Sequence, residues 1–174
     1  MKSRLPLPDV SRLDAAQQAV YDSIVSTRGN ISGPFLAWMH SPVLASHAEK
    51  LGAFCRYHTQ LPLVESELLI LCVAAQFQCI GEQQIHEPIA QSAGLGAQAI
   101  EDLRARRVPA LTDPRQTLLH RLASALLGVN RIPEPLYREG VACFGEQGMV
   151  EIVGIIGYYA LVAMTLNAFE MGMA

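Results

Sequence analysis

Apolar residues recur at every third or fourth position through most of the chain, a spacing typical of helices that bury one face. The pattern, with its caps and breakers, predicts a series of helices joined by short loops. No segment alternates as a half-buried strand does, so we predict an all-α fold. The predicted helices follow an extended N-terminal arm at 1–11 and cover residues from 11 or 14 to 28, then 41–58, 65–76, 80–92, 96–107, 112–127, 133–144 and 146–171.

The residues around position 78 decide whether one long helix or two shorter ones occupy the middle of the chain. Gln76 and Gln78 interrupt an apolar run, and Gly81 and Pro88 weaken a continuous helix further along. We therefore predict a break between residues 76 and 80.

The apolar run between Ile152 and Leu166 is the longest without a charge. At about fifteen residues it is shorter than the roughly twenty that a membrane span needs, so we expect a buried helix and no membrane partner. A chain of 174 residues is most simply one domain over 1–174. Its mean hydropathy of +0.23 exceeds what a small monomer easily buries, which predicts a homo-oligomer.

The charge pattern and the N-terminal sequence bear on partners and location. A net charge of −3 with scattered basic residues argues against nucleic-acid binding. The first ten residues lack the apolar run of a secretory signal, so we expect a cytoplasmic protein. The four cysteines form no CxxC pair, which is typical of reduced thiols rather than a disulfide framework.

Three groups able to do chemistry are spaced for one helix face. Cys79, Glu82 and His86 would line up within about two turns. His86 is the best acid/base candidate, because an imidazole changes charge near neutral pH. Glu82 could hold the tautomer of His86 or pair with its imidazolium. Glu67 could act as a second base if the break folds the helix of Glu67 beside the helix of His86. Both glutamates lie in apolar sequence, where an ionised side chain is costly unless paired.

These residues belong to a recognisable pattern. The segment Glu67-Leu-Leu-Ile-Leu followed by Cys79-x-x-Glu82-x-x-x-His86-Glu-Pro resembles the signature of the carboxymuconolactone decarboxylase and alkyl hydroperoxidase D-like (AhpD-like) superfamily. Segments 28–57 and 151–170 resemble the longer members of the decarboxylase branch. The resemblance implies an AhpD-like helical bundle of about six to eight helices that assembles as dimers, trimers or hexamers.

The sequence departs from the peroxidase half of that superfamily. Those members use Cys-x-x-Cys-x-x-x-His, in which one thiolate attacks peroxide and the second forms a disulfide. Glu82 occupies the second cysteine position here and cannot form that bond. Cys72 would lie roughly 10 Å from Cys79 on a continuous helix, beyond bridging reach. A one-cysteine route through a sulfenic acid and an external thiol stays open.

The resemblance therefore implies a cofactor-free lyase that acts on a small organic acid or lactone, with His86, Glu82, Cys79 and Glu67 as catalytic candidates. Such chemistry needs donors for the developing negative charge and an acid that returns a proton. A carboxylate would be bound by a guanidinium. The candidates for substrate binding are Arg56, Arg28, His40 and Trp38, although Trp38, Phe35, Tyr158 and Tyr159 are more typical of a core or interface.

Two other functions remain open at this stage. One is a thiol-dependent peroxidase centred on Cys79, and the other is a non-catalytic oligomeric binding protein. We expect no metal site, because Glu82-x-x-x-His86 supplies only two ligands and no second cluster accompanies it.

Overall fold

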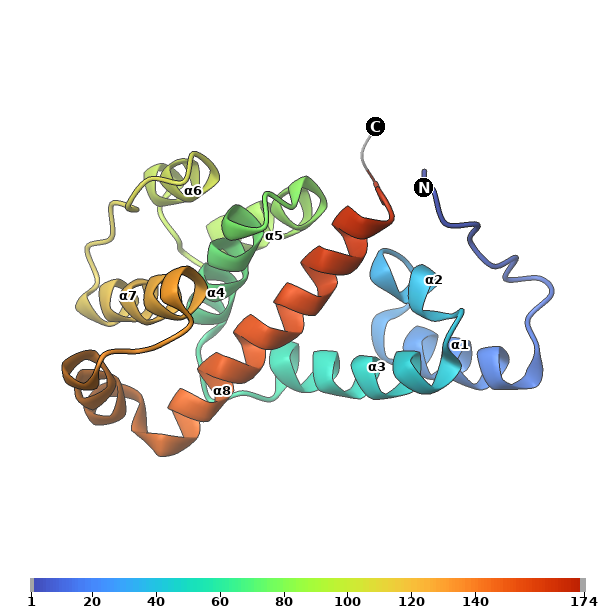
Figure 1. The fold of residues 1–174 in the computed structure, drawn as a ribbon, viewed down its shortest axis with the longest axis horizontal. Helices are drawn as coiled ribbons and strands as arrows, with labels where there is room; N and C mark the ends of the chain where they lie inside the picture. The colour runs from blue at the N-terminus through green and yellow to red at the C-terminus, as the bar shows by residue number, and fades with distance from the viewer. Residues whose placement is uncertain (1, 173–174) are drawn as a thin grey trace.

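The computed structural model describes residues 2–172, and within that range the chain forms eight α-helices and no strand (Figure 1). This all-α architecture confirms the predicted fold class. The helices are α1 (Ala15–Arg28), α2 (Pro34–Trp38), α3 (Pro42–Tyr57), α4 (Leu63–Gln76), α5 (Ile80–Ser92), α6 (Ala97–Arg104), α7 (Pro114–Val129) and α8 (Glu134–Ala168).

The last helix, α8, organises the others. It packs against α2 and α3 on one side and against α4 and α7 on the other. Figure 1 shows α8 running diagonally between a group formed by α4 to α7 and a group formed by α1 to α3. Buried apolar residues of α4 and α8 form the centre of the core. The N-terminal arm returns to the far end of α8, where the Arg4 N–H donates to the Phe169 carbonyl at 3.0 Å.

A tight turn separates α4 from α5, as the polar interruption predicted. Gln78 has a φ of 51°, in the left-handed region. The Cys79 N–H donates to the Ala74 carbonyl at 2.8 Å, and the Gln78 N–H donates to the Ala75 carbonyl at 3.2 Å. This pair of bonds is a Schellman motif, which ends a helix by satisfying its last carbonyls. The turn reverses the chain, so α5 packs against α4.

A second break divides α8 itself. Gly145 has φ 69° and ψ 174°, a conformation that only glycine adopts readily. The carbonyl of Phe144, which the break frees from helical bonding, accepts from the Gln60 side chain at 2.8 Å. The sequence predicted two helices, 133–144 and 146–171, and the kink lies between them.

Local signals explain other boundaries. Asp14 caps α1 through a reciprocal capping box with Gln17. Asp113 caps α7 by accepting from the Arg115 N–H. The short helix α2 was not predicted, because Pro34–Trp38 is too short to show a helical period and follows a loop rich in breakers.

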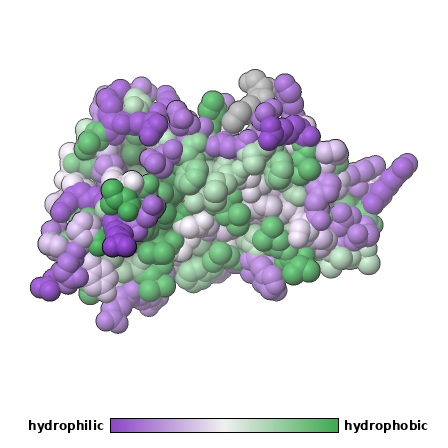
Figure 2. All heavy atoms as spheres, in the orientation of Figure 1, coloured by the Kyte–Doolittle hydropathy of each residue, from purple (hydrophilic) through white to green (hydrophobic). Residues whose placement is uncertain are grey.

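Helix α8 is the one helix in the described part of the chain that is long and apolar enough to cross a membrane. However, 61% of its apolar window is buried inside the protein, which is typical of the core helix of a soluble protein. Part of α8 is exposed nonetheless. Figure 2 shows apolar residues across the middle of the face on which α8 lies in Figure 1.

Candidate functional site

The predicted acid/base residues meet between α4 and α5. Nδ1 of His86 lies 2.7 Å from Oε2 of Glu67, and Nε2 of His86 lies 3.5 Å from Oε2 of Glu82. The turn after α4 makes this possible, because it folds the helix of Glu67 beside that of His86. All three side chains are buried, with exposures of 1% for Glu67, 2% for His86 and 4% for Glu82. The structure therefore contains an imidazole held between two buried carboxyls.

Glu82 is the least satisfied member of this group. Its Oε2 is shielded from solvent and has no hydrogen-bond partner among the described residues. Burial raises the pKa of Glu82, while the neighbouring His86 and Arg56 oppose that rise and Glu67 adds to it. The direction follows from desolvation, which disfavours the charged form of a carboxyl. Glu82 is therefore more readily protonated than an exposed glutamate.

Two tyrosines from α8 form an aromatic wall beside the imidazole. The ring of Tyr159 meets the His86 ring edge to face, with centroids 5.3 Å apart and an interplanar angle of 88°. Tyr158 packs against Tyr159 in the same way at 5.2 Å. Burial raises the pKa of both hydroxyls above the usual range, so both stay protonated and can donate hydrogen bonds.

These groups border a cavity of about 240 Å³. The cavity lies between the 30–35 segment, α3, α5 and α8. Its wall combines an acid/base pair, two guanidinium groups and two phenols, from residues Glu82, His86, Arg28, Arg56, Tyr158 and Tyr159. Glu67 is not part of the lining, and it lies behind His86.

The structure brings both predicted arginines to this cavity. Arg56 comes from α3, and its charge opposes the rise in the pKa of Glu82. Arg28 ends α1, and its guanidinium stacks on the Phe35 ring at 4.8 Å. Neither arginine forms an ion pair with residues 2–172. Two unpaired cations beside a carboxyl with a raised pKa suit a negatively charged ligand.

Two predicted substrate-binding residues lie elsewhere. His40 is exposed, and its Nε2 lies 2.6 Å from the Pro6 carbonyl, where it ties down the N-terminal arm. Trp38 is buried behind the cavity wall and donates from Nε1 to Thr165 Oγ1 at 3.0 Å. His40 and Trp38 are placed by contacts with residues distant in the sequence, Pro6 and Thr165. The sequence around each residue therefore could not show that it lies outside the cavity.

Tyr158, Tyr159 and Phe35 are buried, as expected of core residues, but they also line the cavity. The sequence contained a weak signal for the tyrosines, since they are polar groups within a long apolar helix. A buried phenol requires either an internal hydrogen-bond partner or access to a polar cavity. The need for a polar cavity could have marked Tyr158 and Tyr159 as site residues.

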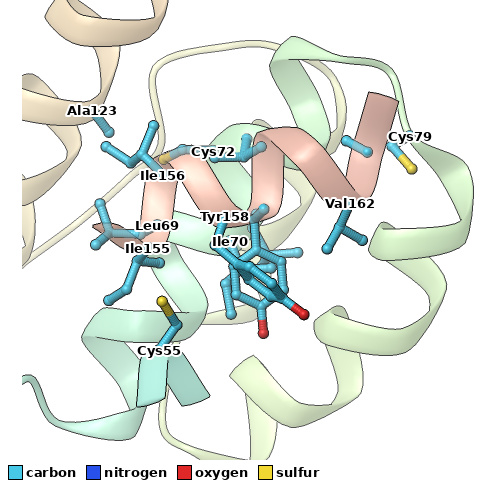
Figure 3. Packing of buried hydrophobic residues seen from close by; sticks show 14 of the residues in the cluster. Cys55, Leu69, Ile70, Cys72, Cys79, Ala123, Ile155, Ile156, Tyr158 and Val162 are labelled. Carbon is cyan, nitrogen blue, oxygen red and sulfur yellow. The ribbon is translucent and has the colours of Figure 1, made fainter. Parts of the chain in front are cut away.

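Cys79 occupies the N-cap position of α5, just before the helix that holds Glu82 and His86, and its side chain makes no capping hydrogen bond. Its side chain is fully buried and is not part of the cavity lining. Burial raises the pKa of the thiol, although backbone N–H groups of Glu82 and Gly81 partly oppose the rise. Figure 3 shows Cys55, Cys72 and Cys79 at separate positions around the core. All four cysteines are free, and burial raises the pKa of Cys72 to about 12.

Within residues 2–172 no three His, Cys, Asp or Glu side chains are arranged to hold a metal ion. The Glu67–His86–Glu82 group presents only the imidazole and one carboxyl to the cavity, and both already face each other. The imidazole and the carboxyls can form hydrogen bonds and transfer protons.

Comparison with known proteins places this geometry on a known scaffold. No protein-family model and no curated protein sequence matches the chain. Two solved structures match with a TM-score of 0.77 and 18% identity each: a peroxidase-related protein with the alkylhydroperoxidase AhpD core from Ralstonia eutropha JMP134, and a peroxidase-related protein from Silicibacter sp. TM1040. Each alignment covers 97% of this chain and 90% of the other. The chain has the AhpD-like fold.

The AhpD-like fold agrees with the bundle that the sequence resemblance implied. Both comparison proteins are named as peroxidase-related, whereas this chain has Glu82 where the dithiol motif has its second cysteine. The fold is a scaffold for a site, and the reaction must be argued from the residues at that site.

Proposed function

We propose that the protein is a cofactor-free lyase of the carboxymuconolactone decarboxylase type, which acts on a small organic acid or lactone by proton transfer. One observation supports this proposal above all. His86 is held by buried Glu67 and faces Glu82 at the wall of a cavity that also holds two arginines. We also propose that the protein belongs to the AhpD-like superfamily and is cytoplasmic, as its four free cysteines suggest.

Glu67 determines which nitrogen of His86 can act as the base. In the proposed tautomer, Nδ1 of His86 carries the proton and donates a hydrogen bond to Glu67, since a carboxylate oxygen accepts hydrogen bonds. Nε2 then carries the lone pair and is directed toward Glu82 at the cavity wall. Glu67 also stabilises the imidazolium that forms when Nε2 takes a proton. It is a positioning residue, since it does not reach the cavity.

Glu82 suits the opposite role. Its raised pKa favours the protonated form, which can donate a proton to a bound substrate. A neutral acid and a basic imidazole side by side are the arrangement that proton transfer in both directions requires. Glu82 and His86 are therefore the proposed catalytic pair.

The proposed reaction breaks a carbon–carbon bond next to an unsaturated or carbonyl group. When the carboxylate leaves as CO₂, its bonding electrons remain on the substrate as an enolate. The guanidinium groups and tyrosine hydroxyls can stabilise this negative charge. A proton from Glu82 or the His86 imidazolium then adds to carbon, which completes the exchange of CO₂ for hydrogen.

A peroxidase centred on Cys79 is less well supported by the site. The thiolate is the reactive form of cysteine, and an oxidant must reach it. Here burial raises the pKa of the Cys79 thiol, and the side chain is not part of the cavity lining.

The test is CO₂ release from a panel of β-keto acids, unsaturated acids and acid lactones, with hydroperoxide consumption under a dithiol reductant measured in parallel. We expect His86→Gln and Glu82→Gln to lower the rate on the best substrate about a hundredfold or more. Glu67→Gln should lower it less. Cys79→Ser and His120→Gln serve as controls and should keep the wild-type rate.

Full activity in folded His86→Gln and Glu82→Gln proteins would contradict the proposal. Hydroperoxide turnover that disappears in Cys79→Ser would instead establish thiol chemistry. Circular dichroism and sedimentation of each variant would show that fold and assembly are intact.

A further inference from the structure

Gly52 in α3 leaves room for two polar groups at one end of the cavity. A Cβ at this position would lie 2.2 Å from the Tyr158 hydroxyl and 3.0 Å from Nη2 of Arg28. The first distance is too short for any side chain and the second is tighter than most such contacts, so another residue here would displace the Tyr158 hydroxyl and crowd Arg28. The glycine therefore allows Tyr158 and Arg28 to meet over the same stretch of backbone.

Arg28 is half-buried, and two of its guanidinium nitrogens lack a partner. Its Nε and Nη2 are shielded from solvent and make no hydrogen bond within residues 2–172. The stacking on Phe35 covers one face of the guanidinium but satisfies none of its N–H groups. Nearby Glu49 accepts from Thr27 and Ser23 instead. An unpaired, desolvated guanidinium is costly, and a ligand anion would offset that cost.

The Tyr158 hydroxyl is also without a partner. It makes no hydrogen bond to the described residues, although the side chain is buried and lines the cavity. Because the phenol stays protonated, it can donate one hydrogen bond to an oxygen ligand. A guanidinium and a phenol over one backbone position form a set of donors with no internal acceptor.

We propose that Arg28 and Tyr158, seated over Gly52, form the subsite that binds the substrate's carboxylate group. This inference rests on the proposed function and deepens it, because it names the residues that hold a carboxylate of the substrate. The guanidinium forms charge-assisted hydrogen bonds to the carboxylate oxygens, and Tyr158 donates to one of them. The acid/base pair Glu82 and His86 occupies another part of the same wall.

The chain provides its own reporter for this subsite. Trp38 is the one tryptophan in the sequence. Its ring meets the Tyr158 ring at 6.3 Å and the Phe35 ring at 5.3 Å, and Phe35 supports Arg28. A ligand bound to Arg28 and Tyr158 would change the surroundings of these rings and hence the fluorescence of Trp38.

The experiment titrates the full chain with benzoate and butyrate beside the neutral amides benzamide and butyramide. Binding is followed by Trp38 fluorescence and by calorimetry, which does not depend on the aromatic wall. We expect the carboxylates to bind at least tenfold more tightly than the amides. Arg28→Gln should weaken carboxylate binding about tenfold or more and abolish that preference, and Tyr158→Phe should weaken it severalfold. Arg12→Gln, at an exposed position just after the N-terminal arm, is the matched control and should bind as the wild type does.

Equal affinity for acids and amides would overturn the subsite, as would unchanged carboxylate binding in folded Arg28→Gln and Tyr158→Phe proteins. A loss confined to Arg56→Gln would assign the carboxylate to the other arginine and would also overturn it. Binding is measured without turnover, so the proposed function is judged separately. If His86→Gln kept full activity while Arg28→Gln lost carboxylate binding, the function would fail and the subsite would stand.

Discussion

At the scale of single residues, burial and neighbouring charges have opposite effects on the pKa of Glu82. The side chain is removed from water, which favours its neutral form, while His86 and Arg56 favour the ion. Burial is the larger effect. A carboxyl whose pKa is raised by burial holds its proton to higher pH than an exposed one, and the same property makes it a source of pH-dependent stability.

Replacing Glu82 by Gln should therefore change how stability depends on pH. In the wild type the folded state holds its proton more tightly than the unfolded state does, so stability falls as pH rises from about 4.5 through the raised pKa. The slope is at most about 1.4 kcal/mol per pH unit for one group. Urea unfolding at several pH values should show this fall for the wild type relative to Glu82→Gln. Glu101→Gln, on an exposed surface, should keep the wild-type slope, and a parallel slope in Glu82→Gln would contradict the pKa direction.

The sequence contained part of this site but not its arrangement. Glu82 and His86 are four residues apart, so on any helix their side chains lie close together, and this contact could be predicted from the sequence. The contact of His86 with Glu67 depends on how the chain turns at residue 78, which local pattern does not specify. Tyr158 and Tyr159 enter the site through the packing of α8, nearly 80 residues further along the chain. Such tertiary contacts leave no periodic signal.

At the scale of elements, the turn between α4 and α5 brings the helices that hold Glu67 and His86 together. Its left-handed position is occupied by Gln78 rather than by glycine, the residue that Schellman motifs favour. The polar interruption predicted the break, but the left-handed conformation could not be predicted, because glutamine rarely adopts it. The bonds from Cys79 and Gln78 to the end of α4 hold the strained residue in place.

We predict that Gln78→Gly stabilises the protein by up to about 1 kcal/mol, because glycine adopts positive φ without a Cβ clash. Gln84→Gly is the matched control. It lies exposed within α5, where glycine should destabilise by about 1 kcal/mol. Thermal and urea unfolding of both variants would measure the difference, and destabilisation by Gln78→Gly would show that the glutamine side chain contributes more than the backbone strain costs.

At the scale of the whole molecule, the apolar excess of the sequence is only partly buried. Val150 and Val153 on α8 are 72% and 49% exposed. Together with Ile132 and Tyr137 they line an open apolar hollow of about 390 Å³. We propose that a second copy of the chain covers this surface, since its apolar residues are contiguous and the same excess led the sequence to predict a homo-oligomer.

The Val150→Asp and Val153→Asp double variant should therefore reduce the mass of the particle in solution without unfolding the chain. A buried charge at the interface would disfavour association, whereas an exposed aspartate on a monomer costs little. Sedimentation or light scattering would report the mass. Val108→Asp alters a valine that is 81% exposed in a loop outside this surface, and it should leave the mass unchanged. Equal masses for wild type and double variant would rule out this surface as the interface.

The central position of α8 also has a consequence for how the protein is made. A ribosome synthesises the chain from its N-terminus, so α1 to α7 emerge while the helix that packs against α2, α3, α4 and α7 is still missing. The core cannot close around a helix that has not yet been synthesised. Until α8 has been synthesised, the nascent chain exposes the surfaces of α3 and α4 that α8 covers, so completing this core depends on a helix made after the other seven.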